Sequence, residues 1–237
     1  MFPTHTLIQQ PFLAKESENM DEIYFSKIRP DFHNRDARNA MSDTEELHKL
    51  LMSAFPDFEG NGRQKTNLLF RVETDGFIIA SSTIKPDWSF LGPGFMVDGI
   101  KVLDLSTTRL VGADFAFRLV ANPTYKKSGS KDVVPLREYY TQDFLDKYKM
   151  TKNPPNVFEW MERKANSSGF QIRQLSVVGL NYRPDGSSKR SINFKMYLFE
   201  GQLRVIDGPL FAKTLKTGIG REKAFGCGLL SIAPARG

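Results

Sequence analysis

The stretch "FEGQLRVIDGPLFAKTLKTGIGREKAFGCGLLSIAP", residues 199–234, predicts a strand, a helix, a glycine-rich segment and a last strand, in that order. Apolar and polar residues alternate over 199–207, which is typical of a half-buried strand. Gly208 and Pro209 follow, and proline suits the first turn of a helix. Phosphate-binding fingerprints place their glycines after a strand and before a helix, whereas these glycines come after the helix. The order therefore disfavours a Rossmann or P-loop domain.

The first half of the chain predicts a similar mixture of elements. Residues 22–28 alternate as a strand does, and residues 42–57 carry apolar side chains at helical spacing. Ser42 and Glu45 resemble a capping box at the start of that helix. Residues 68–83 contain two strand-like runs joined as a hairpin. This half therefore follows the order strand, helix, strand, strand.

The second half repeats that order and then adds a helix and a strand. A strand is expected at 114–123 and a helix at 156–169, ahead of the stretch quoted above. This order fits an α+β fold of two tandem ferredoxin-like domains, as in RRM and RAMP proteins. We expect an N-terminal arm at 1–20, a first domain at 21–111 and a second at 112–237.

Composition limits the classes of function. The 237 residues include 40% hydrophobic ones, enough for a core, but no apolar run reaches the roughly 18 residues of a membrane span. We therefore expect a cytoplasmic protein with no membrane partner. The net charge of +6 and the sequence pI of about 9.3 suit a polyanion. One cysteine and three histidines show no metal-ligand spacing, so we expect no metal and no other cofactor.

Several motifs of the chain resemble one family and occur in the same order as in that family. The C-terminal "GIGREKAFGCGLLSIAP" is the most specific of them. The others are "YFSKI" at 24–28, "ELHKLL" at 46–51, "FRLVANPTYKKSG" at 117–129, "WMERKANSSGF" at 160–170 and "FEGQLRVID" at 199–207. Together they resemble the CRISPR-associated CasE endoribonucleases of type I-E systems.

The resemblance implies a function as well as a fold. Members of this family bind the stem-loop of a CRISPR repeat and cut the precursor RNA at the 3′ base of the stem without a metal. Product RNA commonly stays bound, and the enzyme becomes one subunit of the Cascade complex. The implied partners are therefore CRISPR repeat RNA and other Cascade subunits, with no direct contact to DNA.

His48 is the candidate catalytic residue. RNA cleavage by an attacking 2′-hydroxyl needs proton transfer, and the ordinary histidine pKa of about 6.5 suits that task near neutrality. His48 lies at the margin of the apolar helical face, and the family match in "ELHKLL" favours it. Glu45 occupies the place, one turn earlier, where some members carry a tyrosine, which leaves the second catalytic group open. His33, in the predicted loop 29–41, is the competing candidate.

We expect RNA phosphates to be contacted by clustered basic residues and by the glycine-rich segment. The expected contacts are Arg29, Arg35 and Arg38; Lys126, Lys127 and Lys131; Arg183, Lys189 and Arg190; and Gly218, Gly220, Arg221, Lys223, Gly226 and Gly228. A tight turn that only closes the last helix onto the last strand is the alternative for the final group. Cys227 is interpreted as a packed side chain and not a nucleophile.

Two other functions fit the fold. One is a noncatalytic RNA-binding subunit in which His48 is incidental. The other is a ferredoxin-like regulator whose basic residues converge on an anionic metabolite in a pocket. Specific cutting, specific binding alone, or neither would separate the three.

Overall fold

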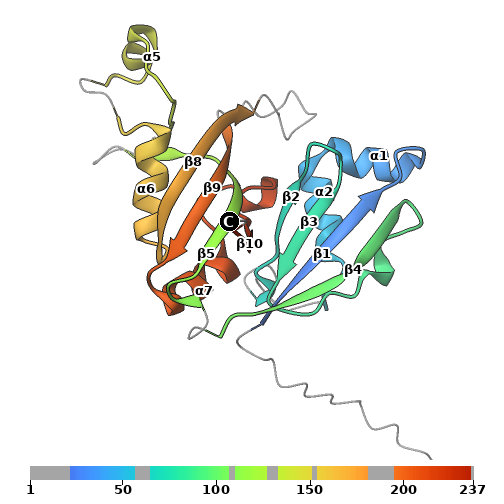
Figure 1. The fold of residues 1–237 in the computed structure, drawn as a ribbon. Coiled ribbons are helices and arrows are strands. Elements are labelled where there is room, and N and C mark those ends of the chain that lie inside the picture. Colours follow the sequence, from blue (N-terminus) through green and yellow to red (C-terminus); the bar gives the residue numbers. More distant parts are fainter. Residues whose placement is uncertain are drawn as a thin grey trace, which may run out of the picture.

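The computed structural model describes residues 22–56, 65–106, 110–126, 133–150, 154–180 and 195–235. Two four-stranded antiparallel sheets stand side by side in this part of the chain (Figure 1). The predicted arm at 1–20 and the predicted basic hairpin around 183–190 lie outside the described residues. No helix within the described ranges is long and apolar enough to cross a bilayer.

The first sheet has the strand order β2-β3-β1-β4, and each neighbouring pair is antiparallel. Its domain comprises β1 (Glu22–Pro30), α1 (Arg35–Ser42), α2 (Thr44–Met52), β2 (Leu69–Val72), β3 (Ile78–Ser82), the 3-10 turn η1 (Trp88–Phe90) and β4 (Phe95–Asp104). Leu47 and Leu51 of α2 are buried in one cluster with Phe70 of β2. The apolar face predicted for α2 is thus the face that closes this core.

The second sheet has the order β10-β5-β9-β8. Its domain comprises β5 (Asp114–Ala121), α6 (Val157–Asn166), β8 (Phe170–Leu180), β9 (Met196–Val205), α7 (Gly208–Thr217), the 3-10 turn η2 (Lys223–Phe225) and β10 (Leu230–Pro234). An excursion between β5 and α6 carries β6 (Thr124–Lys126), β7 (Val133–Pro135) and α5 (Gln142–Lys147). Both domains have the strand order of ferredoxin-like folds, so the predicted tandem α+β architecture is confirmed.

Local chemistry fixes the helix ends in the second domain. Asn156 and Glu159 form a capping box at the start of α6, with each side chain accepting a backbone N–H of the other residue. The side chain of Asp207 accepts the Leu210 N–H at 2.9 Å and so begins α7. Gly218, at φ +72°, ends that helix. The glycine-rich segment therefore starts at a fixed point.

Two local predictions for the first domain are wrong. Residues 35–42 form helix α1 where a loop was expected, because the side chain of Asn34 caps the N–H groups of Asp36 and Ala37. The expected capping box of Ser42 and Glu45 is also absent from this described region. Asp43 caps α2 instead, and its side chain accepts the Glu45 N–H at 2.8 Å. Ser42 ends the preceding helix.

The two domains meet through a buried arginine on β2. The Arg71 residue is only 4% exposed, so its charge is largely removed from water. Its Nη1 atom donates to the carbonyl oxygens of Arg118 and Leu229, each at 3.3 Å, and Nη2 donates to Oγ of Ser231 at 3.0 Å. These acceptors belong to β5, to the residue before β10, and to β10. Arg71 therefore ties the edge strand of the first sheet to the second sheet.

Glu73 supplies the compensating negative charge at this junction. It accepts a hydrogen bond from Nε of Arg71 at 2.9 Å and another from Nη1 of Arg118 at 2.7 Å. Nε of Arg118 also donates to Glu200 at 2.7 Å. Burial lowers the pKa of Arg71, and the hydrogen bond to Glu73 opposes that change. The guanidinium therefore stays charged inside a network of five side chains, those of Arg71, Glu73, Arg118, Glu200 and Ser231.

Replacing Arg71 by methionine should strongly destabilise the protein, because it leaves buried carbonyls and part of Glu73 unsatisfied. Removing one partner of a buried ion pair typically costs about 3–5 kcal/mol. Urea unfolding followed by circular dichroism measures the change. The matched control is Arg204→Met, which removes the exposed pair between Arg204 and Asp114 and should hardly move the midpoint. Equal effects of the two variants would contradict this prediction.

Candidate functional site

The glycine-rich segment and helix α2 meet at the junction of the domains. The segment runs from Gly218 to Gly228 between α7 and β10, with η2 at its centre. In the folded chain η2 packs against α2 and against β2. The structure thus brings together two motifs that are more than 150 residues apart in the sequence, since Lys223 follows His48 by 175 positions.

His48 lies on the side of α2 that reaches β2. Its ring is half-buried and tilted by 43° against the ring of Phe70, with 6.1 Å between the centroids. One of its ring nitrogens, Nε2, is shielded from solvent. Thr44 precedes His48 by one helical turn and therefore shares its face of the helix. This placement agrees with a histidine at the margin of the apolar face.

Glu45 points toward a lysine and not into a cap. Its carboxylate lies 3.8 Å from Nζ of Lys49, which also pairs with Glu46 at 2.7 Å. The hydrogen bond and the charge of Glu46 raise the pKa of Lys49. The three side chains form an exposed charged row on α2. The negative charge of Glu45 is thus partly offset by Lys49.

The two cations of the glycine-rich segment differ in their surroundings. Nζ of Lys223 donates a hydrogen bond to the carbonyl oxygen of Thr217, at the last turn of α7. Arg221 is exposed on the segment. Glu222 between them adopts a left-handed conformation at φ +59°, which is uncommon for a residue with a side chain. Lys223 therefore helps to close the turn, while Arg221 faces solvent.

The four glycines also divide into two pairs. A Cβ on Gly218 would lie 2.6 Å from the carbonyl oxygen of Gly228, and one on Gly228 would lie 3.0 Å from that of Ile219. A Cβ on Gly220 or Gly226 would meet only ordinary contacts, at 3.4 Å or beyond. All four have positive φ. The tight-turn alternative therefore accounts for the first pair through close backbone contacts and for the second pair through positive φ.

Cys227 is fully buried in an apolar cluster with Val120 and Met196. Burial, with a smaller contribution from Glu222, raises the pKa of its thiol to about 12. The thiol is therefore protonated at neutral pH, as expected for a packing residue. Within the described ranges, no cluster of three or more His, Cys, Asp or Glu side chains is placed to share a metal ion.

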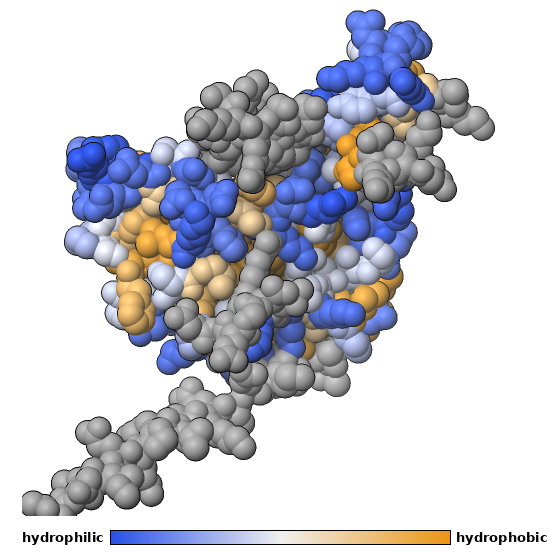
Figure 2. All heavy atoms as spheres, turned by 180° about the vertical axis from the view of Figure 1, so that it is seen from behind, coloured by the Kyte–Doolittle hydropathy of each residue, from blue (hydrophilic) through white to orange (hydrophobic). Residues whose placement is uncertain are grey.

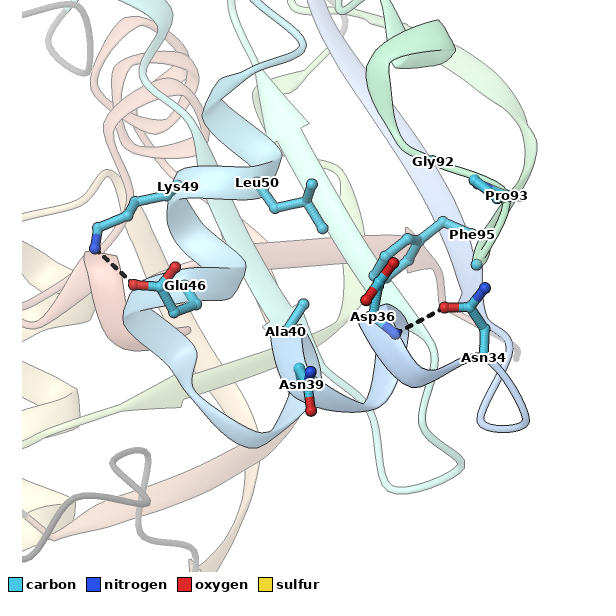
Figure 3. A pocket seen from close by; sticks show the side chains of 11 residues that line it. Asn34, Asp36, Asn39, Ala40, Glu46, Lys49, Leu50, Gly92, Pro93 and Phe95 are labelled. Atoms are coloured by element: carbon cyan, nitrogen blue, oxygen red, sulfur yellow. Dashed lines mark hydrogen bonds and ion pairs between the residues drawn. The ribbon is translucent and has the colours of Figure 1, made fainter.

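Two hollows in the first domain and at its border could hold a ligand. The larger of the two lies away from the glycine-rich segment. A hollow of about 410 Å³ is bounded by α1, α2 and the turn before β4 (Figure 3). Its rim carries Asp36 and Glu46, and its Lys49 is already paired with Glu46. Seen from behind, apolar residues gather on the first domain among hydrophilic ones (Figure 2). The two carboxylates at the rim, the paired lysine and the apolar surface do not favour binding of the anionic metabolite that the regulator hypothesis requires.

The second hollow lies at the domain junction and encloses about 300 Å³. Its lining includes residues of β2, Thr44 of α2, Val120 of β5, Phe225 of η2 and Gly226, which follows η2. Phe70 lines this hollow and also contacts the ring of His48. The candidate site is therefore a composite of histidine, glycine-rich segment and interdomain cavity.

Comparison with known proteins decides the family. The family model described as CRISPR associated protein matches residues 23–234. This chain belongs to the CasE (Cse3) family. It is 28% identical over 229 residues to the CRISPR-associated endoribonuclease Cse3 of Thermus thermophilus, covering 90% of this chain and 100% of that protein. The Escherichia coli relative, CRISPR system Cascade subunit CasE, is 25% identical over 213 residues, covering 84% of this chain and 96% of that protein.

Solved structures of the CasE (Cse3) family share the fold. A structure of the CRISPR endoribonuclease Cse3 bound to 19-nucleotide RNA superimposes with a TM-score of 0.71 at 26% identity, covering 91% of this chain and all of that one. A second structure, of Thermus thermophilus Cse3 bound to an RNA representing a pre-cleavage complex, has a TM-score of 0.70 at 25% identity, covering 90% of this chain and all of that one.

Other predicted RNA contacts of this CasE-family chain lie apart from the histidine. The turn before α1 occupies the end of the first domain remote from the second sheet, and α1 runs from there back toward α2 (Figure 1). The Arg29 side chain there pairs with Asp98 at 2.8 Å, and Arg38 donates to the carbonyl oxygens of Phe32 and His33, each at 2.9 Å. Arg35 and His33 are exposed. The structure does not bring this group to the glycine-rich segment.

The remaining predicted contacts fall at the edge of the described residues. Lys126 ends β6 and is exposed. Lys127, Lys131, Arg183, Lys189 and Arg190 lie outside the described residues. Sequence reasoning missed Arg71 altogether. Its only signal was a lone arginine within the apolar run "LLFRVE".

Proposed function

We propose that this CasE-family protein is an endoribonuclease that cuts CRISPR precursor RNA at the base of the repeat stem-loop and remains bound as a Cascade subunit. The observation that carries the proposal is the packing of helix α2, which carries His48, against the glycine-rich segment across the domain junction. The names of the relatives support it, since one is an endoribonuclease and the other a Cascade subunit. Solved relatives bound to RNA support the choice of substrate.

The proposed chemistry is an attack by the ribose 2′-hydroxyl on the adjacent phosphorus. The 2′-hydroxyl loses a proton, the bond from phosphorus to the 5′-oxygen breaks, and that oxygen gains a proton. The His48 imidazole performs one of these two proton transfers. Positive charge beside the phosphate stabilises the transition state, and the exposed Arg221 is placed on the segment to supply it. The products are a 2′,3′-cyclic phosphate and a 5′-hydroxyl.

Cleavage of repeat RNA should continue in excess chelator and should leave a 5′-hydroxyl end. In this mechanism the attacking oxygen comes from the RNA itself, so no metal-activated water is needed. Gel analysis of labelled RNA, with kinase and phosphatase treatment of the fragments, identifies the ends. Chelator-sensitive cutting with a 5′-phosphate would overturn the mechanism. Specific binding without any cut would instead identify a noncatalytic RNA-binding subunit.

His48→Ala should lower the single-turnover cleavage rate by about 100-fold or more, because it removes a proton-transfer group. Affinity for the repeat stem-loop should hardly change. His33→Ala is the matched control and should cleave at close to the original rate. The assignment is wrong if His33→Ala abolishes cleavage while His48→Ala retains it.

Arg221→Ala should weaken RNA binding and flatten the slope of log affinity against log salt by about 0.7–0.9, the value for one lost phosphate contact. Its melting temperature should stay unchanged, because the side chain is exposed. Lys223→Ala should lower the melting temperature, since Nζ of Lys223 binds the end of α7. Lys213→Ala, an exposed charge on α7, controls for net charge. A salt slope of Arg221→Ala equal to that of Lys213→Ala would exclude the contact.

A further inference from the structure

The cavity at the domain junction opens beside the proposed catalytic histidine. Thr44 lines the cavity and shares one face of α2 with His48, one helical turn away. Phe70 of β2 lies between the cavity and His48. It lines the cavity, and its ring packs against the His48 ring with 6.1 Å between the centroids. Any group seated in the cavity therefore lies next to the place where the scissile phosphate is proposed to bind.

One wall of the cavity is the outer edge of strand β2. The Glu73 N–H donates to the carbonyl oxygen of Phe77 in the hairpin at 2.8 Å, so the ladder groups of Glu73 face β3. Backbone groups alternate in direction along an antiparallel strand. The N–H and C=O groups of Val72 and Phe70 therefore point away from β3, toward the second domain. This wall offers backbone donors and acceptors in one row.

The opposite wall is apolar. Val120 of β5, Met196 of β9 and Phe225 of η2 supply aliphatic and aromatic surface. The charged groups at the cavity, Arg71 and Glu73, bind each other and the second sheet. The site therefore suits a neutral ligand with flat apolar faces and a polar edge. At about 300 Å³ it is at the small end of ligand pockets.

We infer that this cavity binds one unpaired nucleobase of the RNA substrate, next to the bond that is cut. A nucleobase has flat apolar faces, an edge of donors and acceptors and no charge. Its faces match the apolar wall, and its edge matches the row of backbone groups on the other wall. Its edge meets the backbone of Val72, and its face packs on Val120 and Phe225. This inference rests on the proposed function and adds a determinant of substrate choice to it.

The base pocket also accounts for positioning of the sugar-phosphate chain. With the base held between the sheets, its ribose and phosphate remain outside the cavity, on the side where α2 meets η2. His48 lies on α2, and the exposed Arg221 lies two residues before η2. Seating the base would thus fix the phosphate for in-line attack, a form of orientation that contributes to catalysis.

The first test uses the unaltered protein and a repeat stem-loop RNA with three unpaired nucleotides on each side of the stem. A 2′-deoxy substitution at the cleaved position blocks cutting, and 2-aminopurine replaces each unpaired base in turn. At one position, binding should reduce the fluorescence several-fold, because the base stacks on Phe225. An abasic residue at that same position should lower the cleavage rate about 10-fold or more. Equal fluorescence and equal rates at every position would overturn the inference.

The second test fills the cavity. Val120→Phe places a larger side chain on the apolar wall and should remove both the fluorescence change and the abasic penalty, with stem-loop affinity retained. Val178→Phe is the matched control, since Val178 and Val120 both pair in register with Leu198 and so share one face of the sheet. Val178 is 51% exposed and lies outside the cavity lining. The Val178→Phe protein should show the same fluorescence change and the same abasic penalty as the unaltered protein.

The outcomes separate this inference from the proposed function. Absence of cleavage in any repeat RNA, with the fluorescence change intact, would reject the endoribonuclease and keep the base pocket. Cleavage without a sensitive base would reject the pocket and keep the enzyme. If Val120→Phe does not fold, Met196→Ala removes apolar surface from the same wall and should weaken the fluorescence change. Retention of base discrimination in a folded Val120→Phe protein would also overturn the pocket.

Discussion

A buried cation holds the two domains in one arrangement. Arg71 sits on the edge strand of the first sheet, yet most of its acceptors belong to the second domain. Transferring a guanidinium from water is costly unless every donor finds an acceptor. Glu73 and three groups of the second domain meet that need. Burial of the guanidinium is therefore stable in this relative position of the sheets, whereas in other positions it would cost free energy. The junction therefore favours one relative position of the two sheets.

This constraint propagates to the site through two short steps. Helix α2 packs on β2 through Leu47 and Leu51, so fixing β2 fixes the helix. The segment that carries η2 leads directly into β10, whose Ser231 is bound by Arg71. Fixing both strands brings α2, the helix of His48, against the glycine-rich segment. Neither domain contains this combination alone, which explains why a catalytic function would require a set interdomain geometry.

Sequence patterns predicted the elements that depend on local periodicity. The helix of His48, the first three strands of the first sheet and the strands of the second sheet followed from apolar spacing and from turn residues, whereas β4 (Phe95–Asp104) was not predicted. Helix α1 was missed because it is only eight residues long and mostly polar, so its apolar face is confined to Ala37, Ala40 and Met41. Asp43 was passed over because Ser42 is an equally good capping residue. Arg71 could not be predicted, since its partners lie 47 and 160 residues away.

The glycine-rich segment illustrates how one motif can satisfy two demands. Gly218 and Gly228 are required by the fold, because their backbones approach too closely for a side chain. Gly220 and Gly226 adopt positive φ, and a Cβ there would make ordinary contacts with the rings of Trp160 and Phe70. The turn conformation requires all four glycines through their positive φ, and the close backbone approach adds a second requirement at the first pair. The close approach of the first pair sets the path of the chain, and that path presents the second pair to the junction.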